Sequence, residues 1–410
     1  MKLTYLVQYY PPEQASGLQL VEDLLEGFAN QGWDIHLFTP TPTRGVTAEQ
    51  RKHYTKRRIE KKYEERLTVH RMHLFRERIG FFSRAIRYIL FSIECFWKTV
   101  TVPADCVFTG SGPPSQGVIV GLAKKISRNK KVIYNLQDIF PDSLITSGIA
   151  TEKSTAIKIG RLMERFTYRN ADAIITISDD MKENVVRKGV DPQKVTVIRN
   201  WIDIRKIKPI DKMNNRLFDE LKLERNRFYV VYAGNLGKVQ GIEVIIIAAE
   251  LLRDQHDIQF VIFGNGSEED NIKRKATDFP NISVFPLQPQ ERVSEVYSMG
   301  DVSIIPCKPG TGGSGMPSKT WTIMATGTPI IASFDLGGEM EKTIREAGCG
   351  CCIHAGNAED LATAIMELKE KPETVMTMGQ NARRYAEKQV TKEQAVLKYI
   401  EKIEETVQNK

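Results

Sequence analysis

Short apolar runs alternate with longer amphipathic segments along most of the chain. A short continuous run is typical of a strand buried on both faces, whereas apolar residues spaced three and four apart indicate a helix with one buried side. Helical spacing separates the runs of the first half, which predicts βα units and a mainly parallel sheet. These runs occupy residues 3–7, 35–38, 106–109, 131–136, 173–177 and 195–198.

The same alternation restarts in the second half of the chain. Its strand-like runs occupy residues 229–232, 259–263, 282–285, 302–306, 330–333 and 348–353. Between the halves, residues 204–226 are charged and lack periodic apolar spacing, which indicates a linker. We therefore expect an α/β chain of two doubly wound, Rossmann-like domains, residues 1–203 and 227–390, facing each other across a cleft. A last helix, residues 391–410, is expected to pack back toward the first domain.

A glycine-rich loop, residues 310–315, follows the strand-like run 302–306 and precedes a helix. Its four glycines let backbone N–H groups approach a ligand closely. Pro317 suits the first turn of a helix, where a backbone N–H is not needed. A strand, a glycine loop and a helix N-terminus together favour an anionic ligand such as a phosphate. The alternative is an ordinary surface loop that happens to be rich in glycine.

Composition indicates a globular protein and suggests no metal site. Hydrophobic residues make up 41% and charged residues 27% of the 410 residues, which is ordinary for a globular chain. The six cysteines and six histidines lack metal-ligand spacing, so we expect no metal. Cys349, Cys351 and Cys352 lie in an apolar run and indicate buried thiols in a reducing compartment.

Positive charge is concentrated in one segment. Residues 51–78 contain eleven Lys or Arg and four Glu, a balance of +7 that equals the net charge of the whole chain. An amphipathic, aromatic-rich helix from Phe82 to Val100 follows, with too many charges to span a bilayer. Residues 51–102 are either a core helix after a solvated charged segment, or a surface for anionic lipids. Nucleic acid is not expected, because no recognition motif accompanies the charge.

Two carboxylates follow the strand-like run 131–136, in the sequence Gln137-Asp138-Ile139-Phe140-Pro141-Asp142. Doubly wound proteins place their chemistry on loops at the carboxyl ends of strands. Asp138 and Asp142 are therefore candidate functional residues, and capping of the loop is the structural alternative.

Four motifs lie on the loops of the two expected domains. They are Tyr10-Pro11-Pro12 to Gly17, Val197-Ile198-Arg199-Asn200-Trp201, Tyr232-Ala233-Gly234-Asn235-Leu236-Gly237, and Pro317-Ser318-Lys319 followed by Met324-Ala325-Thr326-Gly327-Thr328-Pro329. Together they resemble the retaining GT-B glycosyltransferases of family 4. The chain is most similar to the branch that adds sugars such as fucose or N-acetyl-fucosamine in bacterial exopolysaccharide, capsule or O-antigen synthesis. The resemblance covers nearly the full chain.

The resemblance implies transfer of a sugar from a nucleotide diphosphate donor, with a UDP-sugar favoured, and retention of the anomeric configuration. The donor would lie mainly on the C-terminal domain and the acceptor, an undecaprenyl-diphosphate-linked saccharide, on the N-terminal one. No metal or other cofactor is implied. The enzyme would be cytoplasmic and peripherally associated with the inner face of the cell membrane through residues 51–102.

The resemblance also implies roles for individual residues. Asp138, Lys238 and Lys319 are the expected catalytic residues. The lysines would neutralise the leaving diphosphate, and Asp138 would orient the acceptor or the developing oxocarbenium ion. The expected substrate-binding residues are Gly17, Asn235, Gly264, Ser314, Gly315, Met316, Ser318 and Thr322.

The chain departs from the family pattern at three positions. Ser314 and Thr322 stand where the family has paired glutamates, and Gln137 stands where it has a histidine. Because an amide cannot act as a general base, we expect the leaving phosphate to take the acceptor proton. Two alternatives stay open: a UDP-sugar 2-epimerase of the same fold, and a non-catalytic protein that binds nucleotide sugars.

Overall fold

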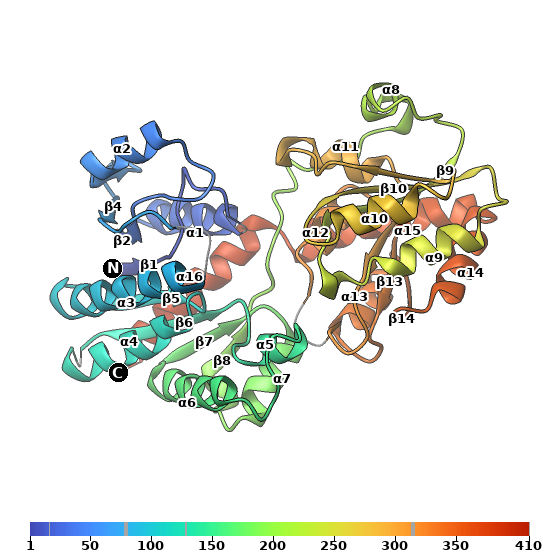
Figure 1. The fold of residues 1–410 in the computed structure, drawn as a ribbon. Coiled ribbons are helices and arrows are strands. Elements are labelled where there is room, and N and C mark those ends of the chain that lie inside the picture. The colour runs from blue at the N-terminus through green and yellow to red at the C-terminus, as the bar shows by residue number, and fades with distance from the viewer. Residues whose placement is uncertain (16, 78–80, 128, 313–315, 410) are drawn as a thin grey trace. The chain divides into compact units, whose positions relative to one another are not determined.

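The computed structural model describes residues 1–15, 17–77, 81–127, 129–312 and 316–409, with only the backbone of Phe81 and Phe82 (Figure 1). The chain divides into two compact units. Met1–Arg199 and Glu393–Lys410 form the first, and Asn200–Lys392 forms the second. Each unit is a mainly parallel sheet with helices on both faces, which confirms the doubly wound α/β fold expected from the alternation.

The first sheet has the strand order β3-β4-β2-β1-β5-β6-β7-β8. Neighbouring strands are parallel except β3, which runs antiparallel to β4. The strands are β1 (Lys2–Leu6), β2 (Asp34–Pro40), β3 (Ile59–Lys62), β4 (Leu67–Met72), β5 (Cys106–Gly110), β6 (Lys131–Leu136), β7 (Ala173–Thr176) and β8 (Val195–Val197).

Helices cover both faces of this sheet. They are α1 (Leu18–Asn30), α2 (Ala48–Lys56), α3 (Phe81–Thr101), α4 (Ser115–Ile126), α5 (Asp142–Thr146), α6 (Thr155–Asn170), α7 (Asp179–Arg187) and α16 (Lys392–Gln408). On one face, Phe91 of α3 and Val120 of α4 share a core with the strands. On the other, the rings of Phe28 in α1 and Tyr399 in α16 meet the Phe108 ring edge to face, with centroids 6.2 and 6.0 Å away.

The basic segment, residues 51–78, is built into this unit and is not a loose charged stretch. It contains β3 and β4, and β4 pairs with both β3 and β2. Arg71 is buried and donates to Glu60 at 2.6 Å, and Arg51 donates to the carbonyl of Leu74 at 2.7 Å. These two cations therefore satisfy internal acceptors and are not available to a lipid surface.

The second sheet is entirely parallel, with the order β11-β10-β9-β12-β13-β14. The strands are β9 (Phe228–Asn235), β10 (Ile258–Asn265), β11 (Ile282–Phe285), β12 (Val302–Pro306), β13 (Ile330–Phe334) and β14 (Gly350–His354). The helices are α8 (Leu217–Glu220), α9 (Glu243–Leu251), α10 (Glu269–Ala276), α11 (Val293–Ser298), α12 (Lys319–Ala325), α13 (Glu339–Ala347), α14 (Ala358–Lys369) and α15 (Pro372–Gln389).

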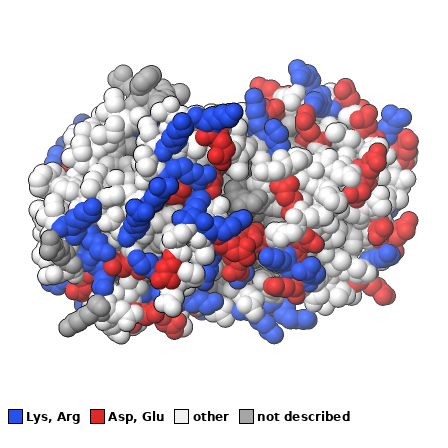
Figure 2. All heavy atoms as spheres, turned by 90° about the horizontal axis from the view of Figure 1, so that it is seen from below, with Lys and Arg blue, Asp and Glu red and all other residues white. Residues whose placement is uncertain are grey.

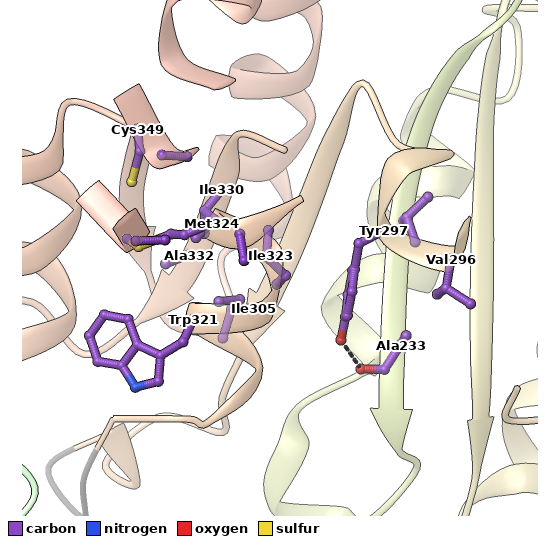
Figure 3. Packing of buried hydrophobic residues seen from close by; sticks show 14 of the residues in the cluster. Ala233, Val296, Tyr297, Ile305, Trp321, Ile323, Met324, Ile330, Ala332 and Cys349 are labelled. Atoms are coloured by element: carbon purple, nitrogen blue, oxygen red, sulfur yellow. Dashed lines mark hydrogen bonds between the residues drawn. The ribbon is translucent and has the colours of Figure 1, made fainter. Parts of the chain in front are cut away.

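Two cores hold the second unit together, one on each face of its sheet. Helices α9, α10 and α14 cover one face, and α11, α12, α13 and α15 cover the other. Figure 3 shows the latter core, where Trp321 and Met324 of α12 pack with Ile305 of β12. Tyr297 of α11 donates to the carbonyl of Ala233 in β9 at 3.2 Å, which fixes that helix over the end of the strand.

Residues 204–226, which we expected to form a linker, lie within the second unit. Leu217 and Phe218 are fully buried in its core, and the Phe218 ring meets the Tyr229 ring edge to face at 5.0 Å. The helix α8 that carries them is a single turn, so it leaves no periodic apolar pattern in the sequence. Its position makes the segment part of the packed domain.

Replacing Phe218 tests how firmly this segment is packed. Phe218→Ala removes a fully buried ring, so we expect the free energy of unfolding of the second unit to fall by about 3–5 kcal/mol. Met213→Ala, in the same segment at a side chain that is 71% exposed, should change it by less than about 0.5 kcal/mol. Urea unfolding followed by tryptophan fluorescence measures both. Equal midpoints for the two variants would contradict the packed arrangement.

Candidate functional site

The strand order of the second sheet reverses at β9, which lies between β10 and β12. At such a switch point the loops from neighbouring strands diverge and leave room for a ligand. Asn235 ends β9 and Lys238 follows it, while Lys319 begins α12 after the loop from β12. The topology therefore brings these three residues to one edge of the sheet.

Hydrogen bonds hold the loops at this edge together. The N–H of Lys308, after β12, donates to the carbonyl of Val239, after β9, at 3.0 Å. The N–H of Leu236, after β9, donates to the carbonyl of Asn265 at the end of β10 at 2.8 Å, and the carbonyl of Leu236 accepts from the N–H of Glu268 at 2.9 Å. Gly264 in β10 is buried, and a Cβ there would lie 2.5 Å from the carbonyl oxygen of Gly234. Close packing of the two strand ends therefore explains the glycine at position 264.

Lys319 is a partly buried cation at this edge. Its Nζ lies 4.2 Å from the centroid of the Tyr232 ring, and the Tyr232 hydroxyl donates to the carbonyl of Asn235 at 2.8 Å. A Cβ at Gly234 would lie 2.6 Å from this Nζ, so glycine leaves room for the ammonium. Among the described residues no carboxylate lies within ion-pair distance of it. Burial lowers the pKa of Lys319 to about 8.

A desolvated ammonium without a carboxylate partner favours an anionic ligand. The ring of Tyr232 stabilises the cation only in part, because a cation–π contact is weaker than a buried ion pair. Asn235 at the end of β9 and Lys238 in the loop that follows are both exposed at the same edge of the sheet. The edge of the sheet is therefore suited to a phosphate or diphosphate group.

Backbone N–H groups in the described part of the glycine loop donate hydrogen bonds to the side chain of Asp335. The N–H groups of Gly310 and Gly312 donate to the two carboxylate oxygens of Asp335 at 2.9 and 2.8 Å. Ser314 and Gly315 lie outside the described residues. The loop N–H groups at positions 310 and 312 are thus used to fix the loop, and Asp335, which directly follows β13, is the anchor.

The remaining candidates after the loop differ in exposure. The side chain of Met316 is buried in the core, Ser318 is exposed before α12, and Thr322 is half-buried in α12. The helix begins at Lys319, two residues later than Pro317 suggested. Of Met316, Ser318 and Thr322, only Ser318 is exposed, just before the start of the helix.

In the first unit, the sheet switches direction between β1 and β5. Gly17 ends the loop after β1 with φ +77°, a left-handed conformation that favours glycine. It precedes α1, whose first turn has no acidic residue and no side-chain cap. The N–H groups of that turn therefore present a positive field at the carboxyl edge of the sheet.

Asp138 lies on the neighbouring loop, after β6. The N–H groups of Gln137 and Asp138 both donate to the Ser111 hydroxyl, at 3.1 and 3.2 Å, which ties the loops after β5 and β6 together. Asp138 itself is exposed at the surface. The surrounding chain still excludes part of the water around its carboxylate, and this desolvation raises the pKa of Asp138. Repulsion from Asp142 raises the pKa further, whereas hydrogen bonds from Ser143 and from the N–H of Ile139 act in the opposite direction.

Asp142 has a structural environment that sets it apart from Asp138. It pairs with the Arg161 guanidinium, with Lys188 Nζ at 2.9 Å, and accepts from Asn184 at 3.0 Å. Burial acts to raise the pKa of Asp142, but Lys188 and the other partners lower it below its usual range. Asp142 therefore joins α5, α6 and α7 through ion pairs and a hydrogen bond, which is a different structural role from the loop capping considered above.

Gln137 is also part of a structural network. Its amide donates to Asn135 Oδ1 at 3.1 Å, and the buried Tyr399 hydroxyl of α16 donates to the same atom at 3.0 Å. The network links the last helix to the end of β6. The side chain of Gln137 is thus positioned by the fold of the first unit.

The four sequence motifs include Tyr232 but predicted no role for it, and Asp335 was not among the candidate residues. Tyr232 lies within the run of β9, where an aromatic residue is expected to be core, and its contact with Lys319 joins residues far apart in the chain. Asp335 directly follows a buried strand, and a carboxylate at the carboxyl end of a strand could have been recognised as a candidate from the sequence.

Comparison with known proteins identifies the family. The model for a glycosyl transferase 4-like domain matches residues 19–201, and the model for glycosyl transferases group 1 matches residues 213–385. The putative colanic acid biosynthesis glycosyl transferase WcaI of Escherichia coli is 30% identical over 291 residues, 69% of each chain. The chain belongs to the group 1 glycosyltransferases. The probable glycosyltransferase WbjE of Pseudomonas aeruginosa is 27% identical over 65% of this glycosyltransferase and 66% of that protein.

Solved structures confirm the fold of the glycosyltransferase. Sucrose-phosphate synthase from Thermosynechococcus elongatus is 17% identical and covers 98% of both chains, with a TM-score of 0.74. Anabaena HepE in complex with UDP is 15% identical and covers 99% of this chain and 100% of that one, with a TM-score of 0.72. The two units thus have the GT-B fold. None of the helices described in this glycosyltransferase is long and apolar enough to cross a membrane.

The lowered pKa of Lys319 predicts a stability cost. A base whose pKa falls from 10.5 to about 8 on folding destabilises the folded state as the pH drops through that window, with the full cost present at pH 7. Lys319→Met should therefore raise the free energy of unfolding at pH 7 by roughly 1–3 kcal/mol. The exposed Lys238→Met is the matched control and should change little. Urea unfolding of both variants checks this, and a destabilised Lys319→Met would refute it.

Proposed function

We propose that the protein transfers a sugar from a nucleotide diphosphate donor, with a UDP-sugar favoured, to an undecaprenyl-diphosphate-linked saccharide in the synthesis of a bacterial surface polysaccharide such as capsule or O-antigen. The observation that carries the donor is Lys319, a desolvated cation at the switch point of the second sheet. Two relatives support it by name: WcaI is assigned to colanic acid biosynthesis, and HepE was solved with UDP and with UDP-glucose. Fucose and N-acetyl-fucosamine remain candidate sugars.

The donor diphosphate would lie on the second unit, against the loops after β9 and β12. In this proposal Lys319 and Lys238 supply the positive charge that stabilises the leaving diphosphate, and Asn235 donates to it. Ser318 would bind the phosphate or the donor sugar at the start of α12, together with Thr322 and the backbone of Ser314, Gly315 and Met316. Gly264 would contribute by letting the strand ends come close, because a Cβ at this position would lie 2.5 Å from the carbonyl oxygen of Gly234.

The acceptor would lie on the first unit, at the edge that carries Gly17 and Asp138. The acceptor oxygen forms a bond to the anomeric carbon on the face from which the diphosphate departs, so configuration is retained. The carbon–oxygen bond to the diphosphate breaks, and that oxygen takes the acceptor proton. Asp138 would orient the acceptor hydroxyl or stabilise the oxocarbenium ion, and the N–H groups near Gly17 would approach the diphosphate.

The site of action in this proposal is the cytoplasmic face of the cell membrane, where the enzyme is peripherally associated. A lipid-linked acceptor stays in the bilayer, so an enzyme that rests on its surface meets the acceptor at high local concentration.

Removing the cation should impair transfer. Lys319→Ala is expected to lower kcat by about 10²–10³, because the leaving diphosphate loses a preorganised charge. Lys308→Ala, an exposed lysine on the loop after β12, is the control and should keep wild-type turnover. Transfer to a lipid-linked acceptor is measured by release of the nucleoside diphosphate. Wild-type turnover of Lys319→Ala would refute the assignment.

The pH dependence of UDP binding gives a second test. Since the protonated lysine attracts the diphosphate, affinity should fall as the pH rises through about 8, the pKa of Lys319 in the free protein. The Lys319→Ala variant should bind weakly at every pH. Calorimetric titration with UDP measures this, and a wild-type affinity that stays constant across the range would contradict it.

The alternatives make different predictions for the same preparations. Conversion of UDP-N-acetylglucosamine in the absence of any acceptor would indicate the 2-epimerase. Tight binding of a UDP-sugar with no transfer to any lipid-linked saccharide would indicate a non-catalytic protein. Retention is checked by the anomeric configuration of the product in NMR spectra.

A further inference from the structure

Helix α3 presents large apolar side chains to the outside along most of its length. Ile86, Ile89, Leu90, Ile93 and Trp97 are between 38% and 59% exposed. Their spacing of three and four residues places them on one side of the helix. A single exposed apolar residue needs no explanation, whereas a continuous row of them is typical of a surface that another partner covers.

The opposite side of α3 is anchored, so the apolar row is held outward. Arg87 is fully buried, and its guanidinium donates to the carbonyl of Thr41 at 2.8 Å and to that of Phe75. At the other end of the helix, Lys130 donates to the carbonyls of Thr99 and Val102, both at 2.5 Å. Rotation of the helix to bury its apolar row would break these bonds.

Two neighbouring helices extend the apolar surface. Helix α4 packs against both α3 and α6, on the same face of the first sheet (Figure 1). Because the three helices cover the same face, their outer sides point the same way. Leu122 and Ile126 of α4 and Ile159 and Leu162 of α6 are also exposed. We call the outer side of α3, α4 and α6 the three-helix surface.

The charge on the three-helix surface is almost all positive. Lys125 of α4 and Lys158, Arg165 and Arg169 of α6 are exposed, and none has an ion-pair partner among the described residues. The acidic residues of these helices are Glu94 and the buried Glu164. Figure 2 views the molecule from the side of α4 and α6, and its left half shows long Lys and Arg side chains beside uncharged areas and groups of Asp and Glu.

We propose that the three-helix surface docks onto an anionic lipid bilayer. The apolar row of α3 enters the interface between headgroups and acyl chains, while the cations of α4 and α6 bind lipid phosphates. The inference rests on the proposed function, which requires a lipid-linked acceptor. Its centre is α3, which belongs to the segment 51–102 that the sequence predicts at the membrane. Helices α4 and α6 extend this contact, whereas Arg51 and Arg71 of the segment donate to internal acceptors.

Charge complementarity favours lipid over a second copy of this chain. In a two-fold dimer through the three-helix surface, the same patch of cations would face itself, and like charges in an interface repel. An anionic bilayer has the opposite charge and an apolar interior, so it satisfies both parts of the surface at once.

Vesicle flotation of the full chain tests the proposal. Vesicles of phosphatidylglycerol and phosphatidylethanolamine should bind the protein, and vesicles of phosphatidylcholine alone should bind it much less. Ile89→Glu/Ile93→Glu is expected to lower the partition coefficient by about a hundredfold. The matched control is Ile247→Glu/Leu251→Glu on α9 of the second unit, where the side chains are 47% and 52% exposed. It should bind as wild type does.

The basic residues are tested separately. Lys158→Gln/Arg165→Gln/Arg169→Gln should weaken binding to the anionic vesicles by about fivefold per residue and reduce its salt dependence. Circular dichroism checks that each variant is folded. Equal binding by the α3 double variant and wild type would overturn the proposal, as would equal loss in the α9 control. A wild-type dimer that Ile89→Glu/Ile93→Glu converts to a monomer in sedimentation would also overturn it.

Transfer to a water-soluble acceptor analogue separates this proposal from the proposed function. A variant that transfers at the wild-type rate but no longer binds vesicles supports docking by the three-helix surface. If wild type binds vesicles through α3 yet transfers to no acceptor, docking stands and the proposed function fails.

Discussion

The ammonium of Lys319, held against the Tyr232 ring without a carboxylate partner among the described residues, is the constraint on which the site depends. The sheet of the second unit places it there, since β9 supplies Gly234 and Tyr232 while the loop from β12 returns the chain to the same edge. A partly desolvated cation destabilises the folded protein. A protein can retain such a destabilising cation where an anionic ligand supplies the missing negative charge. The cation is then already in place to bind that ligand.

The fold was largely predictable because its strands are buried on both faces. Continuous apolar runs marked β1, β2 and β5 to β14, and helical spacing marked the segments between many of them. The exceptions are the strand β4 and the helix that carries Phe218. β4 alternates Leu67 and Val69 with polar residues, and the surrounding cations hid this pattern. Phe218 anchors a single-turn helix inside a charged segment, where neither helix nor strand periodicity has room to develop.

The candidate site was predictable where chain order alone decides position. Residues that follow adjacent parallel strands meet at one edge, which brings Asn235, Lys238 and Lys319 together. The roles of Asp138 and Asp142 could not be separated in this way, because the difference lies in partners from other helices. Arg161 and Lys188 pair with Asp142 and leave Asp138 exposed. The sequence gives no sign of which carboxylate the folded chain will neutralise.

Net charge was an equally incomplete guide to the surface. The first unit uses arginine in two ways that the sequence does not distinguish: Arg71 and Arg87 are buried against internal acceptors, whereas Arg165 and Arg169 stay exposed on α6. The buried cations have a consequence for the exposed ones. Because Arg87 fixes the inner side of α3, the helix cannot relieve the exposure of its apolar row by turning. In the docking that we propose, an anionic bilayer covers this apolar row, and the neighbouring cations bind its phosphates.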